Sequence, residues 1–245
     1  MSEHLVNNQF SDHFDFFWKL IDSKNNFTFA RYADGEILLM KGQEVGSFTQ
    51  ASMVDKWQSP NFLTKVGSQL IETLNHTEDN YYYAISSVSD NINDYNFLKN
   101  NIKQSQDKLT FVNLWINANY KKTINKIISN KREVILICNE NARVDNFPFN
   151  VIDIKSFPND CVNFWEENGN AYIIQLLESV KSYNNTLFYI SCGPVSEIII
   201  HNLYKQNPNN TYIDIGSCID QFIHKKITRP YMVDESIYST MISKF

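Results

Sequence analysis

Short apolar runs alternate along the chain with longer segments in which apolar residues recur every three or four positions. Most of the runs are continuously apolar, which is typical of strands covered on both faces. The runs lie at 27–32, 81–88, 109–115, 133–138, 187–192 and 211–216. The segments with helical spacing lie at 61–75, 93–105, 118–130, 160–182 and 195–206. This alternation predicts an α/β protein with a mostly parallel, Rossmann-like sheet and helices on both faces.

A further helix is predicted near the start of the chain, at about 11–22, where the sequence reads SDHFDFFWKLID. Ser11 or Asp12 is the expected N-cap of this helix. The chain has 245 residues, of which 43% are hydrophobic, and this is enough for one sizeable core. No repeat, low-complexity tract or linker rich in proline and glycine divides it. We therefore expect one domain over residues 1–245.

Charge and cysteine usage narrow the possible partners and compartments. The net charge of −5 offers no broad basic surface, so we expect no nucleic-acid partner. No secretory leader or membrane-spanning stretch is visible, so we expect a cytoplasmic protein without an integral membrane segment. The four cysteines (Cys138, Cys161, Cys192, Cys218) form no C-x-x-C pair, which fits reduced thiols.

Ligands of open parallel sheets bind at the carboxyl ends of the strands, and this rule selects the loops in which to look for chemistry. These loops are 33–36, 116–119 (with Asn117), 139–141, 193–196 and 217–220. Three of the seven glycines, Gly35, Gly193 and Gly216, lie in or beside such turns. Glycine permits a positive φ and the close approach of a ligand to the backbone.

The stretch RYADGE at 31–36 places two carboxylates, Asp34 and Glu36, directly after the first strand. Two such acids can bind Mg²⁺ or Mn²⁺ together with substrate phosphates, and the cation can then neutralise a departing diphosphate. The same pattern also fits an N-cap Asp with a first-turn Glu that stabilises a helix start. Spacing leaves both interpretations open. Arg31 beside these acids is either their salt-bridge partner or a phosphate clamp.

If the protein binds phosphate, it must do so through residues other than the common glycine-rich motifs. Neither G-x-G-x-x-G nor G-x-x-x-x-G-K-[ST] occurs, and G-x-S-x-G is also absent. The Gly193-Pro194 turn either is an ordinary signal for the start of a helix or forms a helix N-terminus that binds phosphate.

The stretch FARYADGEI resembles the start of the GT-D type glycosyltransferases, whose hallmark is a D-x-E sequence. LFYISCGPVSEIIIHNLY is similar to that family's strand, Gly-Pro turn and helix, and YIDIGSCIDQFIHKKITRPY to its closing Asp-x-Gly-Ser segment with a following Arg and Tyr. The stretch FVNLWINANY is more weakly similar to a sequence of the same family. One departure is Ala33, which stands where the family has glycine. The matches cover residues 27–231, after an N-terminal helical segment at 1–26 and before a tail at 232–245.

The resemblance implies a metal-dependent enzyme that moves a sugar from a nucleotide-diphosphate donor, with a UDP-sugar expected, to a hydroxyl of a glycan or glycoconjugate. It implies Mn²⁺ or Mg²⁺ at Asp34 and Glu36, and we expect Asp220 or Asp214 to act as the general base. The expected substrate-binding residues are Arg31, Gly35, Asn117, Gly193, Pro194, Ser196, Asp214, Gly216, Ser217 and Arg229.

Two other function classes remain open. A Rossmann-like nucleotide-binding module without transferase activity is favoured only by Ala33, because alanine would be strained wherever the loop needs a positive φ. A methyltransferase would need a glycine-rich loop after the first strand, and this loop has one glycine and two acids.

Overall fold

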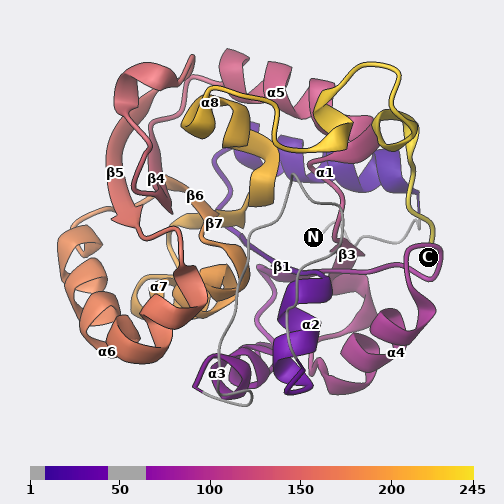
Figure 1. The fold of residues 1–245 in the computed structure, drawn as a ribbon, viewed down its shortest axis with the longest axis horizontal. Coiled ribbons are helices and arrows are strands. Elements are labelled where there is room, and N and C mark those ends of the chain that lie inside the picture. The colour runs from indigo at the N-terminus through magenta and orange to yellow at the C-terminus, as the bar shows by residue number, and fades with distance from the viewer. Residues whose placement is uncertain (1–8, 44–64) are drawn as a thin grey trace.

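The computed structural model describes residues 9–43 and 65–245, and in this part of the chain seven strands form one sheet (Figure 1). Their order is β3-β2-β1-β7-β6-β4-β5, and every pairing is parallel. The strands are β1 (Thr28–Tyr32), β2 (Tyr81–Ile85), β3 (Leu109–Phe111), β4 (Val134–Asn139), β5 (Val151–Phe157), β6 (Leu187–Ser191) and β7 (Thr211–Asp214).

Helices cover both faces of this sheet, which confirms the predicted fold class. The residues of one buried cluster assign α2 (Asp34–Met40), α3 (Lys65–Thr73), α4 (Ile92–Asn101), α6 (Cys161–Val180) and α7 (Ser196–Gln206) to one face. A second cluster assigns α1 (Phe10–Asp22), α5 (Tyr120–Ser129) and α8 (Asp220–His224) to the other. No helix among the described residues is long and apolar enough to cross a membrane.

Both faces have cores that are rich in aromatic side chains. Beneath α1, Phe17 and Trp115 pack on Phe29 of β1 at ring-centroid distances of 5.0 and 4.9 Å. On the α7 face, Tyr81 and Tyr204 pack at 5.2 Å, together with the almost fully buried isoleucines at 198–200. All four cysteines are free and buried within these layers, as expected for reduced thiols.

Several element predictions need correction. The strand β5 was not predicted, because VIDIKSF mixes polar with apolar positions and its middle residues are only partly buried at the edge of the sheet. The strand expected at 109–115 ends at Phe111. The first helix begins at Phe10 with Gln9 as its N-cap, so the prediction of Ser11 or Asp12 is wrong. Part of the helix expected at 61–75 lies outside the described residues.

The chain changes face between the neighbouring strands β1 and β7. After β1 it turns to α2 on one face, and after β7 it turns to α8 on the other. Such a switch point, at the carboxyl ends of the strands, is the place where open α/β sheets bind their ligands. The fold therefore places Arg31 of β1 and Asp214 of β7 at this switch point.

Candidate functional site at the switch point

A buried ion pair joins the carboxyl ends of β1 and β7. The Nε atom of Arg31 lies 3.6 Å from Oδ2 of Asp214, and the Asp214 side chain is 5% exposed. The other oxygen of Asp214, Oδ1, accepts a hydrogen bond of 2.8 Å from the Gly216 N–H group. Both oxygens of this carboxylate are therefore engaged, which fixes the Arg31 side chain over the switch point.

Gly216 is required where it stands. Its φ is +54°, a conformation that L side chains rarely adopt, and a Cβ atom at this position would lie 2.8 Å from Nη2 of Arg31. The guanidinium group therefore rests against the bare backbone of the loop that follows β7.

A third element, α7, contributes a carboxylate that the sequence analysis did not select. Glu197 is completely buried, and its Oε1 accepts a hydrogen bond of 3.2 Å from the Arg31 N–H group. Its Oε2 accepts no hydrogen bond from the described residues, and its carboxyl group hydrogen-bonds with the Asp214 side chain. Burial, followed by repulsion from Asp214 and Glu36, raises the pKa of Glu197 well above its ordinary value, which favours the protonated form of this acid.

Glu36 is the fourth charged member of the group, and we call Arg31, Glu36, Glu197 and Asp214 the Arg31 cluster. Burial raises the pKa of Glu36 to about 7, although the attraction of Arg31 opposes the change. Burial alone would lower the pKa of Arg31, but the three carboxylates outweigh this effect and raise it. One permanent cation therefore stands among three acids, and a carboxyl group near its titration point is available at neutral pH.

The two acids of the D-x-E sequence have different surroundings. They are the first and third residues of α2, Asp34 is exposed and Glu36 is buried. The Ala33 N–H group donates a 2.7 Å hydrogen bond to Oε2 of Glu36, so Glu36 caps the helix start. The interpretation of a first-turn Glu that stabilises a helix is thus confirmed for Glu36, while the N-cap is Ala33 and not Asp34.

The backbone settles the expectations about Ala33 and the glycines. Ala33 is extended, with φ −99° and ψ −167°, so alanine is not strained there. Gly193 and Gly216 have a positive φ, at +56° and +54°, as the turns were expected to need. Gly35 does not, because it lies inside α2.

The Gly193-Pro194 turn forms a short 3-10 helix that leads into α7. Ser196, the first residue of α7, is buried and accepts a hydrogen bond of 3.0 Å from the Cys192 N–H group through its Oγ. The turn therefore fixes the start of the helix that carries Glu197 into the Arg31 cluster.

Of the remaining predicted residues, Ser217 lies beside the cluster and two lie further along the chain. The Ser217 hydroxyl lies 2.6 Å from the Tyr231 hydroxyl, and Tyr231 is among the groups that act on the charge of Arg31. Oδ2 of Asp220 accepts a 3.0 Å hydrogen bond from the Thr228 hydroxyl. Arg229 precedes the short 3-10 helix at Pro230–Met232.

Asn117 is at a different place, after β3. It is buried and has a φ of +54°. Its neighbour Ala118 donates a backbone hydrogen bond of 3.3 Å to Met241. Asn117 is therefore connected with the C-terminal segment and not, through any contact of the described residues, with the Arg31 cluster.

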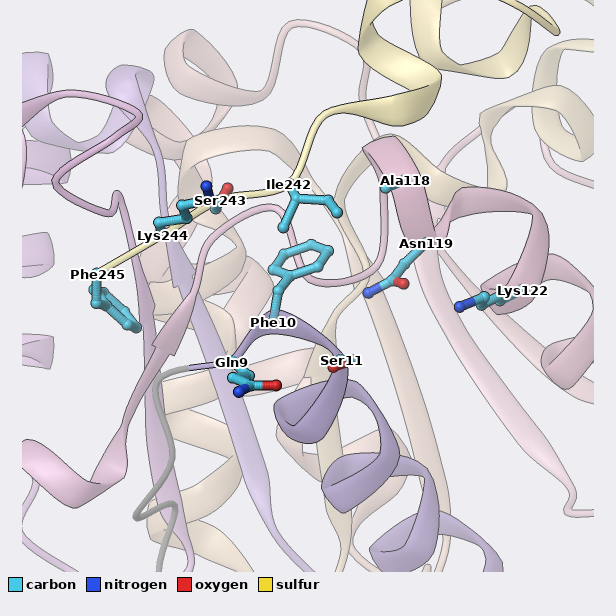
Figure 2. A pocket seen from close by; sticks show the side chains of 10 residues that line it. All are labelled: Gln9, Phe10, Ser11, Ala118, Asn119, Lys122, Ile242, Ser243, Lys244 and Phe245. Atoms are coloured by element: carbon cyan, nitrogen blue, oxygen red, sulfur yellow. The ribbon is translucent and has the colours of Figure 1, made fainter.

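A cavity of about 490 Å³ lies beside the loop that contains Asn117, between the starts of α1 and α5 and the last residues of the chain (Figure 2). Figure 2 shows the ring of Phe10 directed toward Ile242, and the polar ends of Asn119 and Lys122 on the side of α5. Its lining residues are Gln9, Phe10, Ser11, Ala118, Asn119, Lys122, Ile242, Ser243, Lys244 and Phe245. The cavity lies at the carboxyl end of β3, on the same edge of the sheet as the switch point.

A divalent cation at α2 would meet two acids in different surroundings, because Asp34 is exposed while Glu36 is buried and its Oε2 already accepts the Ala33 N–H group. Within the described residues, no group of three or more His, Cys, Asp or Glu side chains is placed to hold a metal ion. This part of the chain therefore offers carboxylate oxygens but no closed cage. Mg²⁺ and Mn²⁺ bind in this way to one or two carboxylates, while water and phosphate oxygens complete the coordination.

Two solved structures are similar to this fold. One is described as a selenomethionine-substituted structure of domain of unknown function 1792, with a TM-score of 0.58 and 16% identity over 90% of this chain and 87% of that chain. The other is described as the highly conserved domain of unknown function 1792 with a distinct glycosyltransferase fold, with a TM-score of 0.55 and 17% identity over 87% of this chain and 80% of that chain. Comparisons with protein-family models and with curated proteins found no match. At these identities the similarity establishes the α/β fold alone.

Proposed function

We propose that the protein is a glycosyltransferase that moves a sugar from a nucleotide-diphosphate donor, with UDP the expected nucleotide, to a hydroxyl of a glycan or glycoconjugate. The observation that carries this proposal is the Arg31 cluster, which lies at the switch point of a glycosyltransferase-type fold. Buried and electrostatically perturbed groups at a predicted ligand position are typical of functional sites.

In the proposed site, Asp34 and Glu36 would hold Mn²⁺ or Mg²⁺ against the donor diphosphate. When bound, the cation would supply positive charge where the diphosphate departs. Arg31 would add a fixed positive charge at the same place, because Asp214 and the Gly216 backbone hold its side chain. The N–H groups at Gly193 to Ser196 would contribute to donor binding, since they precede the helix that contacts Arg31 through Glu197.

The transfer itself needs a base for the acceptor hydroxyl. The acceptor proton would pass to a carboxylate while the new bond to the anomeric carbon forms and the bond to the diphosphate breaks. Asp220 would take this role, because both oxygens of Asp214 bind Arg31 and Gly216, while the hydrogen bond from the Thr228 hydroxyl would orient the Asp220 carboxylate. Ser217 and Arg229 flank Asp220 in the chain and would complete the acceptor side.

A screen of sugar nucleotides by thermal shift, with and without Mn²⁺, tests the proposal first, and donor hydrolysis or transfer follows for each donor that stabilises the protein. A donor that binds the folded state raises the Tm in proportion to RT ln(1 + [L]/Kd). We expect at least one sugar nucleotide to raise the Tm only with the cation present, and turnover to stop when the cation is chelated. If no sugar nucleotide stabilises the protein, or if turnover is indifferent to the cation, the proposal is wrong.

The binding module without activity is the competing function, and the same screen separates the two. The strain at Ala33 that favoured it is absent, because this residue is extended. A pure binding module would show the thermal shift without any hydrolysis or transfer.

A further inference from the structure

Exposed apolar side chains are concentrated in one segment of the chain. Thirteen large apolar side chains are exposed among the described residues, and six of them lie in the C-terminal segment 225–245. Two more, Val88 and Ile92, flank the loop that this segment contacts. The six are Ile227, Val233, Ile237, Tyr238, Met241 and Ile242, with Ile237 the most exposed at 78%.

Hydrogen bonds hold the end of this segment against the loops that follow β2 and β3. Lys244 exchanges two with Ser89, through its N–H group (2.8 Å) and its carbonyl (3.2 Å). The Ser243 hydroxyl donates to Asp90 at 2.9 Å. Phe245 stacks on Phe111, the last residue of β3, at a centroid distance of 4.2 Å. The apolar side chains are therefore presented by an anchored segment, at the carboxyl edge of the sheet (Figure 1).

The same surface carries positive charge that the protein does not neutralise. Lys225, Lys226 and Lys244 of the segment, and Lys122 of α5, form no ion pair with any described residue. The cavity beneath the segment is lined by Lys122 and Lys244 and by no Asp or Glu side chain, in a protein whose net charge is −5. Of the two acids of the segment, Asp234 is paired with Lys121 at 2.8 Å and Glu235 is the other, while Asp90 of the neighbouring loop accepts the hydrogen bond from Ser243.

We propose that the C-terminal segment 225–245, with Val88 and Ile92, is a docking surface for an anionic phospholipid bilayer, and that the cavity between Phe10, Lys122 and Lys244 receives a phosphate-bearing headgroup. Exposed aliphatic and aromatic side chains flanked by lysines bind such interfaces through apolar burial and attraction to anionic lipids. A large exposed apolar patch marks an interaction site. Its unpaired lysines favour an anionic surface over a second copy of this acidic chain, because the partner must be negatively charged and apolar together.

Docking in this way would turn the carboxyl edge of the sheet, and with it the switch point, toward the bilayer. The acceptor hydroxyl would then be carried on a lipid. This last consequence rests on the proposed transferase function, whereas bilayer binding does not.

Sedimentation of the full chain with phosphatidylcholine vesicles, with and without phosphatidylglycerol, tests the proposal. We expect binding only when phosphatidylglycerol is present, and loss of binding at high salt. The double change Ile237→Ser with Ile242→Ser should reduce the bound fraction strongly. The change Lys225→Glu with Lys226→Glu should lower the partition coefficient by about fivefold or more for each reversed charge.

Matched control variants come from exposed residues far from this surface. Ile174 on α6 is 69% exposed and Lys131 precedes β4, so Ile174→Ser and Lys131→Glu should leave the bound fraction unchanged. Circular dichroism checks that every variant is folded.

The proposal is overturned if anionic vesicles do not bind the folded protein, or if controls and test variants bind equally. It is also overturned if ultracentrifugation shows a dimer that only the isoleucine variants abolish while vesicles do not bind. None of these outcomes depends on transferase activity, so the two proposals can fail separately.

Discussion

Single residues at the switch point hold charges where a folded protein rarely tolerates them. Glu36 is 6% exposed and its pKa is raised to about 7, because burial disfavours its charged form. The folded state therefore binds this proton more tightly than the unfolded chain, whose glutamate pKa is near 4.5. Such a group contributes stability at low pH, and the contribution is lost as the pH rises from the unfolded pKa through the folded one.

Glu36→Gln should consequently stabilise the cation-free protein in a manner that depends on pH. Glutamine keeps an oxygen for the Ala33 N–H group but carries no charge. The free energy of unfolding of the variant, relative to the unaltered chain, should rise by about 2 kcal/mol between pH 5 and pH 8. Urea unfolding at the two pH values measures the difference. A difference that stays constant with pH would show that Glu36 is already ionised at pH 5.

Gly216→Ala should be destabilising and should also displace Arg31. The positive φ costs an alanine about 1–2 kcal/mol, and its Cβ atom would press on the guanidinium group. Gly42→Ala is the control, because Gly42 has a φ of +65° at the end of α2, away from the cluster. Urea unfolding should show a larger loss for Gly216→Ala than for Gly42→Ala. Equal losses would mean that only the backbone conformation, and not the space beside Arg31, requires glycine.

At the scale of elements, α7 connects the two halves of the site. Glu197 near its start binds the backbone of β1 and faces Asp214 at the end of β7. The carboxylic acid, if it keeps its proton as its raised pKa indicates, acts as a neutral hydrogen-bonding group. A neutral isostere should then replace it, while a truncation should not.

Glu197→Gln should therefore change the free energy of unfolding by less than about 1 kcal/mol at pH 7, whereas Glu197→Ala should cost about 2–4 kcal/mol. The alanine leaves the Arg31 N–H group without its partner and creates a cavity beside it. Chemical denaturation of the two variants provides the comparison. A glutamine variant as unstable as the alanine variant would indicate that Glu197 is ionised in the folded protein.

The sequence predicted the central strands better than the edge strands, and it selected three of the four residues of the Arg31 cluster as candidates but missed Glu197. Continuously apolar runs identify β1, β2, β4, β6 and β7 because both of their faces are covered. The edge strand β5 lacks this signal. Glu197 was missed because it stands between Ser196 and three isoleucines and looks like an ordinary helix position. An acid that directly precedes an apolar helix run over the centre of a sheet was the signal available.

At the scale of the whole molecule, the residues of both proposed sites lie along one edge of a single sheet. The carboxyl ends of the seven parallel strands present the Arg31 cluster at β1 and β7, and the apolar and basic C-terminal segment beside β2 and β3. The fold thus accounts for why residues from β1, α2, α7 and β7, far apart in the sequence, surround one guanidinium group. A donor at the switch point and an acceptor presented from a bilayer would approach each other along this edge.

Calorimetric titration of UDP with Mn²⁺ tests most directly whether the Arg31 cluster is the donor site. The unaltered chain and Glu133→Ala, a change at an exposed acid before β4, should bind UDP with equal affinity in the presence of Mn²⁺. Glu36→Ala should lose about tenfold or more in this affinity and should show no difference between titrations with and without Mn²⁺. Binding of UDP to Glu36→Ala with the affinity and cation dependence of the unaltered chain would contradict the assignment.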